Sequence, residues 1–407
     1  INYHIIKGDR VWAIGGWDTH GLPVELEVEH ILGVKSKRDI EEKIGIVNFV
    51  ETCRNIVDKY IKLWVEDNLK WAIWLDYENA YETRHVKYVE TVWNFIKRVD
   101  EKNLLVEGVK VVPRCPRCGT ALSQHEVEMG TKKVKWPSLY FMVKLIEPLK
   151  PGLDNTHLVI WTTTPWTIPG NIAVAVNKDV EYSVIKCTSG DNEVKHLVVS
   201  KASTPMIMKI LGENPGFKDC SIVSSVKGLD LVDLKYEPVQ QELVEIPLEV
   251  RSSGFKILHA DWVTESMGTG IVHIAPMHGP EDYELALTYN LPVWSPLGID
   301  GVFKQGLLKD LSYLDSTRRI VEYLKSKGLL VSFKIEDHEY PHCWRCETPI
   351  LFYASRQWFI KTSELKTGLE NALNDVEFYP QWSRNRMVNW IRSIRDWCIS
   401  RERYWGT

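Results

Sequence analysis

Four of the eight cysteines occur in two pairs whose spacing is typical of a metal site. The pairs are Cys115–Cys118 in P-R-C-P-R-C-G-T and Cys343–Cys346 in P-H-C-W-R-C-E-T. In each pair, two thiolates could bind one side of a tetrahedral zinc ion, and two such pairs complete a four-thiolate site. Residues 119–342 separate the pairs, whereas a usual zinc ribbon leaves about 15–20 residues between them.

This long separation leaves three interpretations open. One zinc ion could join both pairs, so that the ends of the intervening segment meet in space. Alternatively, two separate metal sites are completed by His125 or His342. In the third interpretation the paired cysteines are redox-active or simply part of the core.

The remaining four cysteines are isolated along the sequence. An isolated cysteine is commonly a small buried apolar residue, and nothing here indicates the disulfide framework of a secreted protein. We expect burial without chemistry for all four: Cys53, Cys187, Cys220 and Cys398.

A peptide rich in threonine, W-T-T-T-P-W-T-I-P-G-N, occupies residues 161–171. Alternating Trp and Thr could pack in an edge strand, but Pro165 and Pro169 exclude a continuous central strand. A loop rich in hydroxyls remains, and hydroxyls donate and accept hydrogen bonds without carrying charge. Such a loop suits the binding of a polar ligand and the orientation of a water molecule.

A second dense motif is G-T-G-I-V-H-I-A-P-M-H-G-P-E-D-Y, residues 268–283. Pro280 suits the first position of a helix, which places Asp282 in the first turn, where the helix dipole favours an ionised carboxylate. An ionised aspartate there could hold an ammonium group. Alternatively, Glu281 and Asp282 only stabilise the helix start and His273 is a satisfied strand residue; metal binding by His273 and His278 is a further alternative.

The motif G-G-W-D-T-H-G-L-P-V-E, residues 15–25, follows a short apolar run at 11–14 that fits a buried strand. Glycines allow close approach of a ligand to the backbone. Asp18 would lie at the carboxyl end of that strand, where open α/β sheets bind ligands. The alternative is an ordinary strand-to-helix turn with a capping aspartate.

The elements around these motifs predict an α/β chain with a β-rich insertion. Apolar periodicity indicates helices over 40–74 and 84–104. Short strand-like runs with turn signals then suggest a compact, barrel-like β domain. These runs cover residues 158–161, 171–176, 182–185, 196–199, 249–259 and 270–275, and helical patterns return at 281–289 and 316–327.

Composition is that of an ordinary water-soluble protein. The 407 residues are 44% apolar and 26% charged, with a net charge of −4, and the length suggests two or three domains. No apolar run reaches the roughly 18 residues of a membrane span, and no signal or transit peptide is present. We expect a cytoplasmic monomer without membrane contact, and a fragment, because no initiator Met is present and the first residues read like the interior of a domain.

Together with D-W-C-I-S-R-E-R-Y-W-G-T at 396–407, these motifs resemble, in order and spacing, the successive signatures of class I isoleucyl-tRNA synthetases. The resemblance covers essentially the whole chain, and the wording of the last motif is similar to the archaeal and eukaryotic branch. It implies a partial Rossmann-type catalytic domain, interrupted by a β-barrel-like editing domain with a zinc-knuckle base. The implied boundaries are 1–136 for the first catalytic part, including a knuckle at 113–120, 137–335 for the editing domain, and 336–407 for the second knuckle and second catalytic part. The resemblance also supports Cys115, Cys118, Cys343 and Cys346 as ligands of one structural Zn²⁺.

For the synthetic site, the resemblance implies ATP-dependent activation of isoleucine and its transfer to tRNA(Ile), with Mg²⁺ accompanying ATP. Asp18 matches the aspartate that holds the isoleucine amino group. Trp358 matches a wall of the amino-acid pocket, and Glu402 and Trp405 match contacts to the adenylate. Two ATP signatures of the family, His-x-Gly-His and Lys-Met-Ser-Lys-Ser, are absent from this chain. We therefore do not expect this chain alone to form adenylate.

For the editing site, the resemblance implies hydrolysis of valine misattached to tRNA(Ile). One methylene in an apolar pocket allows an enzyme to discriminate between two substrates by only about 10–200-fold. The choice of isoleucine over valine by this type of enzyme is the standard example of that limit. Asp282 matches the aspartate that anchors the valine α-amino group. The residues matching the surroundings of the ester and terminal adenosine are His273, Thr162, Thr163 and Thr164, with Asn171 in the same motif.

Two other classes of protein fit this sequence less well. A free-standing trans-editing hydrolase would not need the flanking halves of a catalytic domain. A zinc-stabilised RNA-binding module without catalysis would not need Asp282 opposite a threonine peptide.

Overall fold

The computed structural model describes residues 1–34, 37–190 and 193–406, and the chain divides into two units. The first unit comprises residues 1–109, 117–123 and 356–407, and the second comprises residues 110–116 and 124–355. The predicted domain boundaries after 136 and after 335 fall inside two long strands, β5 and β13. None of the described helices is long and apolar enough to cross a membrane.

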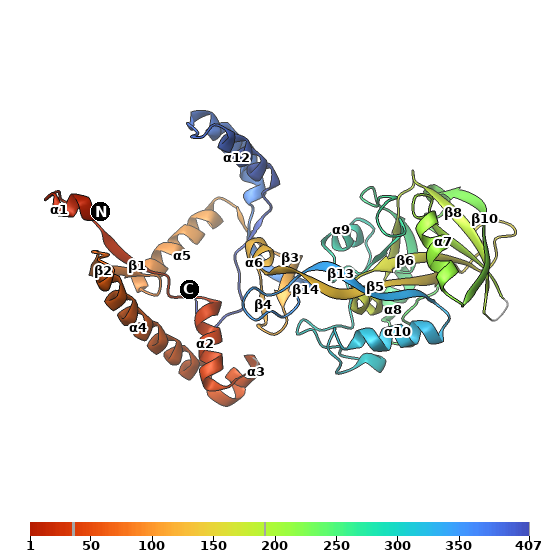
Figure 1. The fold of residues 1–407 in the computed structure, drawn as a ribbon, viewed down its shortest axis with the longest axis horizontal. Helices are drawn as coiled ribbons and strands as arrows, with labels where there is room; N and C mark the ends of the chain where they lie inside the picture. The colour runs from red at the N-terminus through yellow and green to blue at the C-terminus, as the bar shows by residue number, and fades with distance from the viewer. Residues whose placement is uncertain (35–36, 191–192, 407) are drawn as a thin grey trace. The chain divides into compact units, whose positions relative to one another are not determined.

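The second unit contains a six-stranded sheet with the order β10-β8-β9-β6-β5-β13. Its strands are β5 (Thr131–Lys144), β6 (Thr156–Thr162), β8 (Glu181–Ser189), β9 (Val194–Ser200), β10 (Phe217–Lys227) and β13 (Leu330–Pro341). β5 and β13 run side by side in antiparallel register from Phe141 opposite Leu330 to Thr131 opposite Pro341 (Figure 1). Only β6 and β9 pair in parallel among these neighbours.

A three-stranded sheet of the same unit has the order β11-β7-β12. It comprises β7 (Ala173–Val176), β11 (Lys256–His259) and β12 (Val272–Ile274). Helices α7 (Thr204–Glu213), α8 (Leu248–Ser253), α9 (Pro280–Thr288) and α10 (Ser316–Ser326) complete the unit. A single apolar core joins the two sheets, with Phe141, Leu158 and Val174 fully buried within it.

The expectation of short strands separated by turns is confirmed for most of this region, but two details differ. Across the described residues the strands form open sheets rather than a closed barrel, because β10 and β13 remain edge strands. The run 249–259 is helix α8 followed by β11. Two residues separate them, and the second, Phe255, has a left-handed backbone conformation at φ 58°.

Two of the supposedly isolated cysteines are paired. Cys187 on β8 and Cys220 on β10 form a disulfide, so the expectation of burial without chemistry is wrong for this pair. The reason is the pairing of the two strands, which sets Lys218 opposite Thr188 and Ser221 opposite Lys186 and so brings the cysteines between them together. Cys53 is buried as expected, whereas Cys398 is only half-buried.

The first unit combines a parallel strand pair with helices. β1 (Ile14–Trp17) pairs in parallel with β2 (Asp76–Glu82), so the strand begins at the end of the run 11–14 rather than occupying it. The helices are α1 (Asn2–Ile6), α2 (Leu22–Leu32), α3 (Lys37–Asp39), α4 (Ile46–Lys70), α5 (Val86–Glu101), α11 (Lys366–Ala372) and α12 (Trp382–Ser393), and a π-helical turn η1 (Ile40–Ile44) precedes α4. In the core of the first unit, Val28, Phe49 and Trp405 pack together.

Strands β3 (Leu105–Cys115) and β14 (Leu351–Ile360) are hydrogen-bonded neighbours in a four-stranded sheet with the order β15-β14-β3-β4. Its short members are β4 (Thr120–Ala121) and β15 (Trp397–Cys398). α6 (Gln124–Gly130) leads from β4 into β5. Cys115 therefore ends β3, and Cys118 lies in the turn between β3 and β4.

Candidate active site and metal centre

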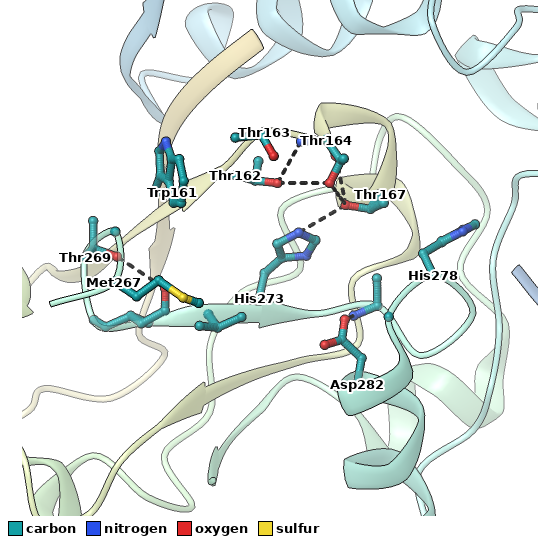
Figure 2. A pocket seen from close by; sticks show the side chains of 15 residues that line it. Trp161, Thr162, Thr163, Thr164, Thr167, Met267, Thr269, His273, His278 and Asp282 are labelled. Carbon is teal, nitrogen blue, oxygen red and sulfur yellow. Dashed lines mark hydrogen bonds between the residues drawn. The ribbon is translucent and has the colours of Figure 1, made fainter. Parts of the chain in front are cut away.

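A cavity of about 260 Å³ lies within the second unit. One wall comes from the end of β6 and the start of the 3-10 helix η2 (Pro165–Gly170), and the facing wall from β12 and the start of α9 (Figure 2). Its polar lining consists of Thr162, Thr163, Thr164, Thr167, Thr269, His273, His278 and Asp282. The cavity thus brings together the threonine peptide and the 268–283 motif.

The threonine wall is ordered by hydrogen bonds among its own members. The backbone N–H of Thr164 donates to the hydroxyl of Thr162 at 3.1 Å. The Thr167 hydroxyl donates to the carbonyl oxygen of Thr164 at 2.8 Å. Both bonds are local side chain–backbone turns of the kind that replace regular secondary structure. The hydroxyl oxygens of this wall can still accept hydrogen bonds from a ligand in the cavity, and they carry no formal charge.

The same network favours one tautomer of His273. When the Thr167 hydroxyl donates its proton to the Thr164 carbonyl oxygen, the hydroxyl oxygen accepts from His273 Nε2, which lies 3.1 Å away. In this arrangement Nε2 carries the proton, and Nδ1 is a bare acceptor. Nδ1 is buried and has no hydrogen-bond partner among the described residues. Burial lowers the pKa of His273 to about 4, so the ring is neutral near pH 7.

Asp282 faces the threonine wall from the first turn of α9 (Figure 2). The helix begins at Pro280, as predicted, with Gly279 before it. A Cβ atom on Gly279 would lie only 2.6 Å from the Asp282 carboxyl carbon, so glycine at this position makes room for the carboxyl group. The Asp282 Oδ2 atom accepts the backbone N–H of Ala275 at 2.8 Å.

Burial acts on the charge of Asp282 in the direction opposite to the helix start. It raises the pKa of this carboxyl to about 7, against the opposing hydrogen bond from Ala275 and with a smaller contribution from the neighbouring Glu281 charge. The helix start favours the ionised form, whereas removal of the carboxylate from water favours the protonated form. A cation that enters the cavity would reverse this balance.

His278 lies at the rim of the cavity with both ring nitrogens engaged. Nδ1 lies 3.0 Å from the Phe352 carbonyl oxygen and must donate to it, so Nε2 accepts from the Ser295 hydroxyl at 2.8 Å. Burial lowers its pKa to about 4. No described group of three or more metal-binding side chains includes His273 or His278.

Asn171 is placed differently from the other residues of its peptide. It is fully buried and does not line the cavity. Its side-chain N–H donates to the Ala173 carbonyl at 2.8 Å, and its Oδ1 accepts the Tyr236 hydroxyl at 2.7 Å. These bonds anchor the peptide's end to the core.

Sequence reasoning missed other lining residues. Thr167 could have been predicted, since it lies in the threonine peptide. Its hydrogen bond to His273 could not, because it joins residues that only the fold brings together. Gly268 packs against the indole of Trp161, where an added Cβ would lie 2.8 Å from the ring. Met267, Gly268 and Thr269 form the loop beside that ring; Gly268 and Thr269 begin the 268–283 motif, whereas Met267 lies outside it.

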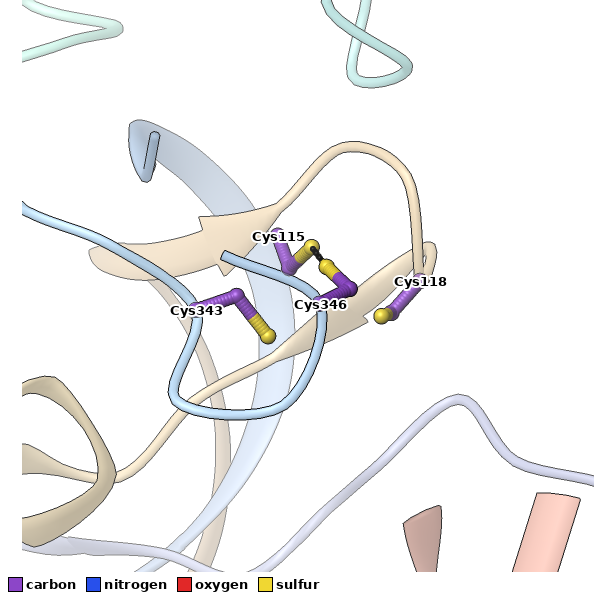
Figure 3. Close-up of side chains that lie close together, drawn as sticks. All are labelled: Cys115, Cys118, Cys343 and Cys346. Carbon is purple, nitrogen blue, oxygen red and sulfur yellow. Dashed lines mark hydrogen bonds between the residues drawn. The ribbon is translucent and has the colours of Figure 1, made fainter. Parts of the chain in front are cut away.

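The four paired cysteines converge in space (Figure 3). Their sulfur atoms all lie within 4.8 Å of one another, and those of Cys115 and Cys346 are 3.4 Å apart. Zinc–sulfur bonds of about 2.3 Å in a tetrahedron would set the sulfurs about 3.8 Å apart, so the donor set fits one zinc ion. His342 bonds the Tyr340 carbonyl through Nδ1 at 2.9 Å, and the side chain of His125 lies outside the described part of the chain.

The residues predicted for amino-acid activation lie in the first unit. Asp18 is exposed, directly after β1, and Trp358 on β14 is 46% exposed. Glu402 accepts the backbone N–H of Ala121 and the side-chain N–H of Gln357, each at 3.2 Å. Trp405 is buried, and its indole N–H donates to the Thr19 carbonyl at 2.6 Å.

Comparison with known proteins shows the family to which the chain belongs. Residues 1–407 match the family described as tRNA synthetases class I (I, L, M and V). The chain is 40% identical over its whole length to the isoleucine–tRNA ligase of Pyrococcus abyssi and 40% identical to that of Thermus thermophilus, and it spans 37% of the length of each. An editing domain of the P. knowlesi cytosolic leucyl-tRNA synthetase aligns with 51% of this chain and 99% of its own, at 14% identity and a TM-score of 0.36. Because the family match covers every residue, the chain belongs to the class I tRNA synthetases.

Proposed function

We propose that this chain is an internal part of an isoleucine–tRNA ligase and that its second unit hydrolyses valine misattached to tRNA(Ile). The observation that carries the proposal is the cavity in which a wall of threonine hydroxyls faces the Asp282 carboxyl group. Full-length identity of 40% to isoleucine–tRNA ligases supports isoleucine as the cognate amino acid.

In this proposal Asp282 binds the α-amino group of the valyl ester. The incoming ammonium group stabilises the ionised carboxylate and lowers its pKa below the value of about 7 set by burial. Binding of a cationic amine and ionisation of Asp282 are thus coupled. A neutral or acylated amine would gain little binding free energy from Asp282, so the site selects a free α-amino group.

Hydrolysis needs a water molecule placed against the ester carbonyl. The water oxygen bonds to that carbon, the bond to the ribose oxygen breaks, and a proton passes to the ribose oxygen as valine leaves. In this proposal Thr162, Thr163 and Thr164 bind the terminal adenosine and orient the water, because hydroxyls both donate and accept. The described cavity lining contains no serine for a Ser-His-Asp triad.

For activation, we propose that the first unit is part of a Rossmann-type catalytic domain that binds isoleucine, ATP with Mg²⁺, and the tRNA end. Exposed Asp18 is available for an isoleucine ammonium group and half-exposed Trp358 for the amino-acid side chain. In this proposal Glu402 and buried Trp405 belong to the segment that binds the adenylate. In-line attack by the isoleucine carboxylate on the α-phosphate depends chiefly on positioning and charge stabilisation.

We further propose a structural zinc ion bound by Cys115, Cys118, Cys343 and Cys346. A closed four-thiolate site leaves no open position for catalysis and contributes folding free energy. Zinc there would join the turn after β3 to the turn after β13. A cytoplasmic location and a monomeric state remain predictions.

The proposal is tested by measuring hydrolysis of valyl-tRNA(Ile) and isoleucyl-tRNA(Ile) side by side. We expect the valyl ester to be hydrolysed and the isoleucyl ester to be spared, since the larger side chain must be excluded by the second site. Equal hydrolysis of both esters, or of neither, would contradict the editing function.

A further inference from the structure

The motif G-W-D-T-H-G-L-P-V-E ends in a glutamate, Glu25, to which the proposed function gives no task. Glu25 lies in the first turn of α2 and is only 3% exposed. A buried carboxylate is unfavourable unless hydrogen bonds replace its lost water. The bonds that do so here point to the purpose of the residue.

One carboxylate oxygen of Glu25 accepts two consecutive backbone N–H groups from the far end of the chain. The Tyr404 N–H donates to Oε1 at 2.6 Å, and the Trp405 N–H donates to the same atom at 2.8 Å. These two residues belong to no helix or strand, so no ladder partner satisfies their N–H groups. Hydrogen bonds to a charged acceptor are roughly twice as strong as neutral ones.

Further contacts hold the same segment against the motif. The Trp405 indole N–H donates to the Thr19 carbonyl at 2.6 Å, and the Gly21 N–H donates to the Trp405 carbonyl at 3.3 Å. The Tyr404 ring makes an edge contact with Phe49 at 6.2 Å between centroids. Residues 19–25 therefore form hydrogen bonds with the backbone N–H, the carbonyl oxygen and the indole N–H of Trp405.

These hydrogen bonds connect the two segments of the proposed activation site, one around Asp18 and the other around Glu402. Asp18 directly precedes Thr19, and Glu402 lies three residues before Trp405. All of these residues belong to the first unit. Any shift of the 404–405 backbone would move the proposed adenylate contacts relative to the proposed amino-group contact.

We propose that Glu25 is a positioning residue for isoleucine activation, which sets the spacing between Asp18 and the Glu402–Trp405 segment. The inference rests on the proposed ligase function. Glu25 itself touches no reacting atom, because its carboxylate is buried and bonded to the backbone. It acts through Tyr404 and Trp405.

The test uses the full-length ligase of which this chain is proposed to be a part. Isoleucine-dependent ATP–pyrophosphate exchange and valyl-tRNA(Ile) hydrolysis are measured for Glu25→Leu, Glu25→Gln and the control Glu27→Gln. Glu27 lies on the same helix but is exposed. Hydrolysis of the valyl ester reports on the second unit and serves as the internal measure of folding.

We expect Glu25→Leu to lower kcat/KM for isoleucine in the exchange reaction by about 100-fold, the scale of a small misplacement of reacting groups. Glu25→Gln keeps a neutral acceptor and should lower it by about tenfold. Glu27→Gln should match the wild type, and valyl-ester hydrolysis should be unchanged in all three. Loss of the whole fold would instead lower both activities in parallel.

Wild-type exchange kinetics in Glu25→Gln and Glu25→Leu, or a parallel loss of both activities, would overturn the inference. If Glu25→Leu does not fold, Glu25→Gln decides alone. A wild-type ligase with no isoleucine-dependent exchange would instead overturn the proposed function.

Discussion

The cavity of the second unit and the proposed activation residues of the first unit present their acids to water in opposite ways. Asp282 is half-buried in the cavity wall and receives one backbone N–H, whereas Asp18 is exposed at the end of a strand. Around Asp282 the histidines are buried and neutral, and the threonines are already bonded to one another. The cavity is a preorganised site within a single unit.

This contrast teaches where specificity for a charged group arises. In the cavity, burial makes an uncompensated charge costly, so an ammonium group that restores the Asp282 charge gains a large share of its binding free energy there. At an exposed carboxylate, water already solvates the charge and the same ion pair contributes little.

The largest effect is expected from removing a cysteine of the proposed zinc site. Cys343→Ser should lower bound zinc from about one ion per chain to near zero, because structural zinc requires its full set of thiolates. Elemental analysis of the purified protein measures this. The matched control is Cys53→Ser, a buried cysteine outside the cluster, which should keep its zinc. Unchanged zinc in Cys343→Ser would refute a shared site.

A second effect is expected from closing the space in front of Asp282. Gly279→Ala places a methyl group where the carboxyl group now lies, so the side chain must move. We expect valyl-ester hydrolysis to fall by about 100-fold, since small displacements of binding groups cost this much. Single-turnover rates measure it. Gly212→Ala, a helical glycine with open space around it, is the control, and equal rates in both variants would contradict the expectation.

A smaller effect is expected at the hydroxyl that orients His273. Thr167→Val leaves the buried Nε2–H without its acceptor, which should slow valyl-ester hydrolysis by about tenfold. Thr167→Ser restores the hydroxyl and should recover most of the rate. Identical rates for the valine and serine variants would show that the hydroxyl has no role in orienting the ring.

The smallest effect concerns stability. Asp282 has its pKa raised from 3.8 to about 7 in the folded state, so between pH 4 and pH 7 the folded state holds a proton that the unfolded state has lost. The contribution of Asp282 to the free energy of unfolding therefore falls as pH rises through this window. Asp282→Asn should gain stability relative to the wild type from pH 4 to pH 7 in urea denaturation. A difference that does not change with pH would contradict the raised pKa.

Much of the site could be predicted from residue types, because its motifs are contiguous in the sequence. Pro280 at the first helical position and Asp282 in the first turn needed only local rules. The convergence of the cysteine pairs was one of three interpretations that metal-ligand spacing allowed, and the family resemblance favoured it. The open sheets could not be predicted, since closure of a β domain depends on which strands pair at its edges.

The remaining differences came from tertiary contacts that no local pattern encodes. The protonation preference of Asp282 depends on burial contributed by the whole unit. The Cys187–Cys220 disulfide depends on the pairing of two strands. The Glu25 contacts join residues about 380 positions apart, so neither motif alone announces them.

The central claim is that Asp282 holds the amino group of the misattached valine. Its most direct test is the initial rate of valyl-tRNA(Ile) hydrolysis by the wild type, Asp282→Ala and Glu281→Ala, an exposed acid one residue away. We predict a loss of about 100-fold or more in Asp282→Ala, typical of removing one partner from a buried charge pair, and a wild-type rate in Glu281→Ala. Equal rates in all three proteins would contradict the assignment.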